Sequence, residues 1–136
     1  MDKKFITLFA RLLLGLILFW QGFGKVFSIG LENLYNGGFK AYEETFLPTF
    51  IVKFSAYFTS YGELLFGALL LLGLFRKYTY YGIGLILLIV SFGHGLQSPI
   101  WDTQHVLVRS IFLVFIAMTF DKDTIALDHY IKKNND

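Results

Sequence analysis

Four long apolar stretches occupy most of this chain, and ionisable residues interrupt each of them. A helix rises about 1.5 Å per residue, so about 20 residues cross a hydrocarbon core about 30 Å thick. Each stretch is near that length, the last being the shortest: residues 5–23, 54–75, 78–96 and 105–120. The sequence therefore predicts an all-α integral membrane protein, a four-helix bundle with a polar interior. We expect one domain over residues 1–136.

The hydrophobic content supports a membrane protein over a water-soluble domain. Hydrophobic residues make up 55% of the chain and the mean hydropathy is +0.57, both above the values usual for soluble domains of this size. A cleaved signal peptide is the alternative for the N-terminus, because Lys3 and Lys4 precede an apolar run. That run contains Arg11 and lacks a small-x-small cleavage pattern. We therefore expect the first helix to be retained.

The distribution of Lys and Arg predicts the orientation. These residues mark the N-terminus, the connection after the second stretch and the tail (residues 121–136) as cytoplasmic. The third connection, residues 97–104, has neither Lys nor Arg and carries Asp102. It should face outward. We expect a multi-pass protein with both termini in the cytoplasm.

The first connection, residues 24–53, is too long for a turn and too aromatic for a free linker. Its apolar residues recur at spacings of three and four, with breaks at the Asn36-Gly37-Gly38 segment and at Pro48. This pattern predicts one or two short helices on the outer membrane surface, between the first two spans. We expect the segment to act as a lid.

The net charge and the absence of cysteine exclude several functions. A net charge of +2 is explained by the membrane-orientation bias and does not suggest nucleic acid. Without cysteine the chain has no disulfide, thiolate metal site or thiol exchange of its own. No Glu-x-x-His spacing occurs, so we expect no metal site. A redox role would need a bound cofactor or a partner protein.

The first two spans share a weak sequence similarity. Arg11 precedes Gly15 by four residues, and Glu63 precedes Gly67 by the same spacing. This spacing places the charge and the glycine on one helix face, where glycine lets a neighbouring backbone approach. We expect these glycines to serve helix packing. Arg11 is expected to be structural and to extend toward cytoplasmic headgroups.

Most other polar residues of the spans lie toward the predicted outer side. Glu63 is the costly one, because a charge at the bilayer centre costs about 2.5 to 3.5 kcal/mol and needs a partner. Arg109 is its best partner by depth, with Lys25 and His94 as second choices. A structural ion pair and a ligand or proton site both remain open. The candidate ligand-binding residues are Gln21, Lys25, Glu63, His94, His105 and Arg109.

Two motifs resemble signatures of the DoxX family. The first is Arg11-Leu-Leu-Leu-Gly15-Leu-Ile-Leu-Phe-Trp-Gln-Gly22-Phe-Gly-Lys25, and the second is Gly62-Glu63-Leu-Leu-Phe-Gly67-Ala-Leu-Leu-Leu-Leu-Gly73-Leu-Phe-Arg76. The segment Thr124 to Asp128 is similar to the family's closing Ser-Leu-Asp, although the Gly-Pro-Gly that often precedes it is missing. We expect Gly22 and Gly73 to be structural.

The resemblance implies a four-helix protein of the bacterial inner membrane. It places the chain among redox-associated proteins, which include the small subunit of a quinone-linked thiosulfate oxidoreductase. The expected function is an accessory or scaffold subunit of a redox-associated membrane complex, with partner proteins and an outward polar pocket for a quinone or a lipid. One alternative is a quinone-dependent oxidoreductase subunit in which Glu63 and His94 exchange protons. Another is a small-molecule transporter that works as a homo-oligomer.

Overall fold

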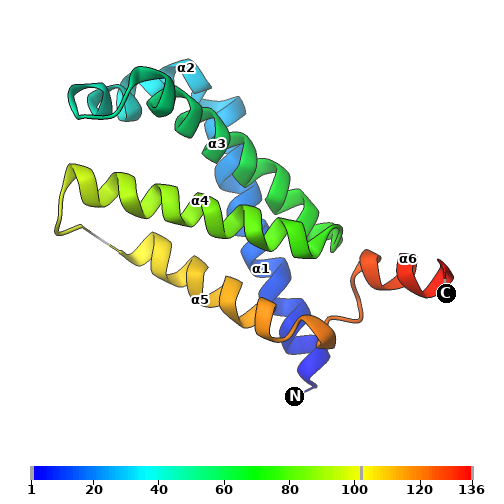
Figure 1. Cartoon of the computed structure of the whole chain (residues 1–136). Coiled ribbons are helices and arrows are strands. Elements are labelled where there is room, and N and C mark those ends of the chain that lie inside the picture. The colour runs from blue at the N-terminus through cyan, green and yellow to red at the C-terminus, as the bar shows by residue number, and fades with distance from the viewer. Residues whose placement is uncertain (1, 102, 136) are drawn as a thin grey trace.

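The computed structural model describes residues 2–101 and 103–135, without the side chains of His105 and Asn135. All regular structure in these residues is helical, which confirms the all-α prediction. Four helices are long, and they alternate in direction between two ends of the molecule (Figure 1). They are α1 (Lys3–Phe23), α3 (Thr49–Leu72), α4 (Arg76–Gln97) and α5 (Gln104–Met118).

Each long helix packs against two others. α1 contacts α3 and α5, and α4 contacts the same two helices from the other side. The shared core consists mainly of Leu and Ile side chains from all four helices: Ala10, Leu14, Leu18, Leu70, Tyr80, Ile83, Leu87 and Ile116. The most extensive contact is between α1 and α3.

Glycines let the backbones of α1 and α3 touch. A Cβ atom added to Gly22 would lie 2.2 Å from the backbone nitrogen of Leu64, and one added to Gly67 would lie 2.4 Å from the backbone nitrogen of Phe19. Gly15 is less crowded, since its added Cβ would meet the side chain of Leu71 at 3.1 Å. The two helices therefore cross without intervening side chains at Gly22 and Gly67.

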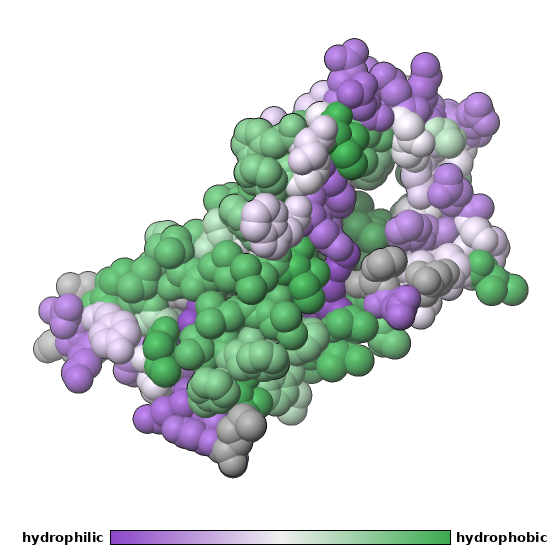
Figure 2. Space-filling view, turned by 180° about the vertical axis from the view of Figure 1, so that it is seen from behind, coloured by the Kyte–Doolittle hydropathy of each residue, from purple (hydrophilic) through white to green (hydrophobic). Residues whose placement is uncertain are grey.

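Three helices are long and apolar enough to cross a membrane. These are α1 with its extension to Ile29, α3 and α4. α5 is apolar but has 15 residues, which span about 22 Å and fall short of a hydrocarbon core about 30 Å thick. In Figure 2 hydrophobic surface covers the middle of the molecule and hydrophilic surface lies toward its ends. This distribution is typical of a membrane protein.

The segment between α1 and α3 is more helical than the sequence predicts, and it is shorter. α1 continues as a π-helix over Gly24–Ile29, followed by α2 (Leu31–Leu34), a π-turn (Tyr35–Phe39) and a 3-10 turn (Lys40–Glu44). α3 begins at Thr49, five residues before the expected start, because Pro48 immediately precedes it and stops the preceding turn from continuing. We use the name lid for residues 24–48.

The lid packs on the first turns of α3. Tyr35, Val52 and Ala56 form a small buried core there, with Phe39 and Tyr42 against it. The hydroxyl of Tyr35 donates a hydrogen bond to the carboxylate of Glu43. Burial and this carboxylate raise the pKa of Tyr35 to about 12, so the phenol remains protonated and keeps donating at neutral pH. The lid is thus a folded cap, with its own core, at one end of the molecule.

The chain after α5 is folded rather than a free tail. A 3-10 turn (Phe120–Lys122) leads into α6 (Leu127–Asn135), at the end opposite the lid (Figure 1). Gly73 ends α3 with φ +69°, a left-handed conformation that glycine adopts without strain. A Cβ atom added to Gly73 would lie 2.7 Å from the Cβ of Ala126. The tail therefore packs closely against the turn between α3 and α4.

Candidate functional site

Glu63 is fully buried on α3 and faces two cations from other elements. Its Oε2 accepts a hydrogen bond from the ammonium of Lys25 at 2.6 Å, and its Oε1 lies 3.7 Å from Nη1 of Arg109. Lys25 comes from the π-helical extension of α1 and Arg109 from α5. The structure therefore joins three elements around one carboxylate. Lys25, a second choice by predicted depth, is the nearer partner.

The cluster carries one more positive than negative charge. Glu63 is 0% exposed and Arg109 is 7% exposed, whereas the side chain of Lys25 is 27% exposed. Glu63 lies fourteen residues into α3, which places it about 21 Å along that helix from Thr49. Its desolvation there is compensated by two cations. Because Arg109 is buried, the excess positive charge is accessible mainly at Lys25.

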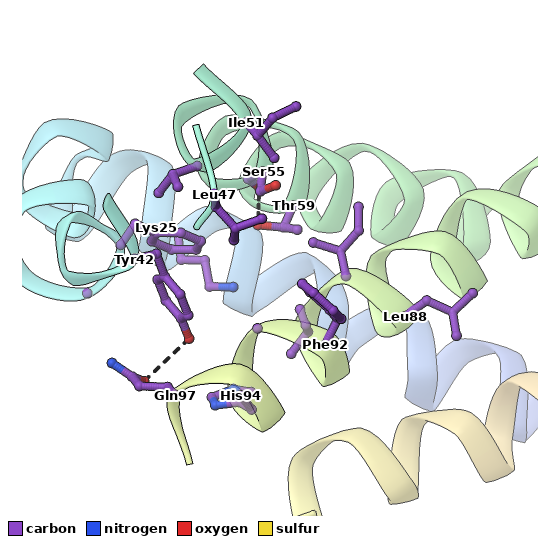
Figure 3. A pocket seen from close by; sticks show the side chains of 16 residues that line it. Lys25, Tyr42, Leu47, Ile51, Ser55, Thr59, Leu88, Phe92, His94 and Gln97 are labelled. Atoms are coloured by element: carbon purple, nitrogen blue, oxygen red, sulfur yellow. Dashed lines mark hydrogen bonds between the residues drawn. The ribbon is translucent and has the colours of Figure 1, made fainter. Parts of the chain in front are cut away.

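A cavity of about 620 Å³ opens beside this cluster, between the lid, α3 and α4. That volume lies within the range of about 300 to 1,000 Å³ usual for small-molecule sites. Its walls are mostly apolar, with Leu47 and Ile51 on one side and Leu88 and Phe92 of α4 on the other (Figure 3). Lys25 belongs to both the cavity wall and the charge cluster. Glu63 and Arg109 belong to the charge cluster but do not line the cavity.

Most of the polar groups gather at one end of the cavity, while the hydroxyls of Ser55 and Thr59 lie away from it, near Ile51 (Figure 3). In Figure 3 Lys25, Tyr42, His94 and Gln97 lie on one side, and Leu88 lies at the other. The hydroxyl of Tyr42 donates a hydrogen bond of 3.3 Å to Oε1 of Gln97, which joins the lid to the end of α4. Burial raises the pKa of Tyr42 above its ordinary value. The cavity thus has a hydrogen-bonding end and an apolar end.

The structure does not bring every candidate residue to Glu63. His94 lines the cavity and its ring stacks on Trp101, with 5.0 Å between ring centroids. Within the described residues, no ion pair or hydrogen bond joins it to Glu63. Gln21 lies one helical turn before Lys25, with its Oε1 buried and without a hydrogen-bond partner among the described residues. The side chain of His105, like Asp102, lies outside the described residues.

A second buried charge cluster lies at the opposite end of the molecule. Asp123 forms ion pairs with both guanidinium groups around it, with its Oδ2 2.7 Å from Nε of Arg11 and 3.2 Å from Nη1 of Arg76. Asp128 binds Arg76 at 3.6 Å and also accepts hydrogen bonds from the backbone N–H groups of Phe75 and Arg76. We name Arg11, Arg76, Asp123 and Asp128 the tail clasp.

The prediction that Arg11 extends to the headgroups is wrong. Arg11 is 1% exposed, donates to the backbone carbonyls of Leu70, Leu71 and Ile125, and forms an ion pair with Asp123. A folded tail supplies a carboxylate, so the guanidinium has internal partners and does not need water or phosphate. The tail clasp therefore joins α1, the end of α3, the start of α4 and the tail.

Sequence reasoning missed Asp123 and the role of Arg76. A signal was present, because Arg11 and Arg76 are both assigned to the same membrane side and Asp123 lies three residues after the last apolar stretch. An arginine eight residues inside a helix needs a carboxylate, and the tail offers the nearest ones. Asp128 lies in the segment that carries the family resemblance.

The described residues contain no group of three or more His, Cys, Asp and Glu side chains able to hold a metal ion. An organic ligand suits the cavity better than a metal, since its donors are an ammonium, an imidazole and an amide on apolar walls.

Comparison with known proteins agrees with the helices and motifs described above. Neither a search of curated proteins nor a search of solved structures found a significant match. The sequence model of the DoxX family matches residues 6–95, which include most of α1, the lid, α3 and most of α4 with Glu63, Lys25 and His94. This match covers well over half of the chain. The protein is a membrane protein of the DoxX family.

Proposed function

We propose that this protein is an accessory or scaffold subunit of a redox-associated complex in the bacterial inner membrane, and that its cavity holds a quinone or a lipid. In this proposal all four long helices cross the bilayer, both termini are cytoplasmic and the lid faces outward. The exposed Lys residues around the tail, Lys77, Lys122, Lys132 and Lys133, favour this orientation. The short α5 is accommodated by local thinning of the bilayer.

The cavity is the observation that carries the proposal. A quinone or lipid has a polar head and an apolar body, and the cavity of about 620 Å³ has the same division. Lys25, His94 and Gln97 offer N–H groups to oxygen atoms of a head group, and Leu88, Phe92 and Ile51 offer apolar contacts. A bound quinone would supply the electron transfer for which the cysteine-free chain has no thiol.

The arrangement favours a binding subunit over a catalyst. Proton exchange by Glu63 with a ligand requires direct or water-mediated contact. Lys25 lines the cavity, whereas Glu63 does not. The carboxylate of Glu63 is instead hydrogen-bonded to that lysine. His94 also stacks on Trp101 instead of facing the carboxylate.

Ligand retention tests this proposal. The protein is purified in a mild detergent and its quinones and lipids are extracted and counted per protein molecule. Replacing Ser55, which lines the cavity, by Phe should fill the space and lower retention by about tenfold or more, the equivalent of about 1.4 kcal/mol.

The matched control is Leu72→Phe, at an exposed position on the same helix and away from the cavity. This variant should retain as much ligand as the unmodified protein. Equal retention by the two variants, or no quinone or lipid bound above the background of the detergent micelle, would contradict the proposal.

A further inference from the structure

We infer that the cavity selects an amphiphile with an anionic head group, a carboxylate or a phosphate, and that Lys25 is the residue that recognises it. This inference rests on the proposed function and narrows it, because a quinone head group is uncharged. Three features support it: the charge of the Glu63 cluster, the position of Lys25 and the shape of the cavity.

The charge balance is the first step. Glu63 provides one negative charge, whereas Lys25 and Arg109 provide two positive charges within 4 Å of its oxygens. Within the described part of the chain, no other carboxylate forms an ion pair with either cation. A buried excess charge in a low-dielectric site is costly, and an anionic ligand would neutralise it.

The position of Lys25 is the second step. Among the described residues that line the cavity, Lys25 is the only lysine or arginine, and none is acidic. Its side chain is 27% exposed, while its ammonium is held at 2.6 Å by Glu63. An ammonium has three donors, and this hydrogen bond uses one of them. The remaining donors are available to a head group in the cavity.

The shape of the cavity is the third step. His94 and Gln97 flank the polar end. Leu88 lies six residues before His94 on α4, about 9 Å away along the helix. The tail of a ligand whose head binds Lys25 therefore follows α4 toward the middle of the bilayer. Tyr42 covers the head from the lid through its hydrogen bond to Gln97.

The test compares two probes with the same chain, one with an anionic head group and one with an uncharged head group. The full-length protein is placed in nanodiscs of phosphatidylcholine, which has no net charge, and is labelled with a photoreactive long-chain fatty acid or with its methyl ester. Labelled peptides are identified by mass spectrometry. We expect the acid to label cavity peptides of α3, α4 and the lid about tenfold more than the ester, a ratio typical of one hydrogen bond to a charged group. Competition by a long-chain alkyl phosphate distinguishes a phosphate-selective from a carboxylate-selective site.

Variants then assign the preference to Lys25. Lys25→Met should reduce the acid-to-ester ratio to about one, and Lys25→Arg should keep it. Lys40→Met, at an exposed lysine of the same lid, should behave as the unmodified protein. Glu63→Gln should raise the ratio, because it releases Lys25 from its partner. A merely structural ion pair would not produce that increase.

Equal labelling by acid and ester in the unmodified protein overturns the inference without any variant. It is also overturned if Lys25→Met keeps the preference. If the purified protein retains quinone but its cavity peptides show no preference for the acid, the proposed function stands. The inference of an anionic head group is then wrong. If neither probe labels the cavity and no ligand is retained, both fail.

Discussion

At the scale of single residues, the contact between α1 and α3 depends on the absence of side chains. The Cβ of an alanine at Gly22 would overlap the backbone of Leu64, which no rotamer change relieves. Gly22→Ala should therefore lower the free energy of unfolding by about 1 to 3 kcal/mol, the usual cost of overpacking. Denaturant titration in detergent micelles measures this change.

Gly84→Ala is the matched control on α4. Its added Cβ would meet only Cδ2 of Leu113, at 3.8 Å, an ordinary van der Waals distance. Alanine there should be neutral or stabilising by up to about 1 kcal/mol, because glycine inside a helix costs conformational entropy. A loss at Gly84 equal to that at Gly22 would show that the crossing does not depend on close backbone approach.

Residue spacing alone could predict which groups are buried but not all of their partners. The interval of four between Glu63 and Gly67 predicted a protein-facing side of that helix, and both residues are buried there. Depth counting placed Arg109 beside Glu63, and the distance is 3.7 Å. It ranked Lys25 lower, because the sequence does not show that α1 continues as a π-helix past Phe23. The continuation of the helix after Phe23 places the ammonium of Lys25 within hydrogen-bond distance of the Glu63 carboxylate.

At the scale of elements, the tail holds the helix ends together through the tail clasp. Asp123 is 2% exposed and lies between two guanidinium groups. Asp123→Asn should lower the free energy of unfolding by about 3 to 5 kcal/mol, because it leaves buried positive charge without a counterion. Thermal or denaturant unfolding in micelles checks the loss.

Asp121→Asn provides the control, since Asp121 is exposed two residues earlier in the same segment. Its effect should stay within about 0.5 kcal/mol, as for most surface substitutions. Comparable losses for both variants would indicate a nonspecific effect of tail charge. The sequence predicted neither this segment's fold nor α6, because a short polar stretch after an apolar span has no periodicity that distinguishes a docked tail from a free one.

The helices themselves were predictable to different degrees. Hydropathy located all four long helices, but their ends depended on caps that contact distant residues. Asp128 accepts from the N–H of Arg76 at 2.8 Å and so fixes the first turn of α4 from the other end of the sequence. Pro48 was a local signal for the start of α3, yet the apolar stretch was read from Phe54. Nonlocal caps therefore limit the accuracy of helix boundaries.

At the scale of the whole molecule, the cysteine-free chain allows a direct test of topology. Single cysteines at Asn36 in the lid and Asn134 in α6 occupy exposed positions at opposite ends. A membrane-impermeant maleimide should label Asn36→Cys in intact spheroplasts and Asn134→Cys only after the membrane is permeabilised. The unmodified protein has no thiol and provides the background.

Labelling of both sites from the same side would contradict three crossings, by α3, α4 and α5, between the lid and α6. In that case α5 would not span, as its length of 15 residues already makes it the weakest of the four helices. Labelling of Asn134→Cys alone in spheroplasts would instead reverse the orientation.

The tail clasp also constrains how the protein is made. Arg11 is synthesised within the first helix, whereas Asp123, the carboxylate that neutralises it, is synthesised only after all four long helices. During membrane insertion the arginine must rely on other partners, such as lipid phosphates or water. The bundle therefore closes only after Asp123 has been synthesised. A chain that terminates before Asp123 has an arginine in its first helix without this counterion. We expect proteases of the membrane to degrade such a product.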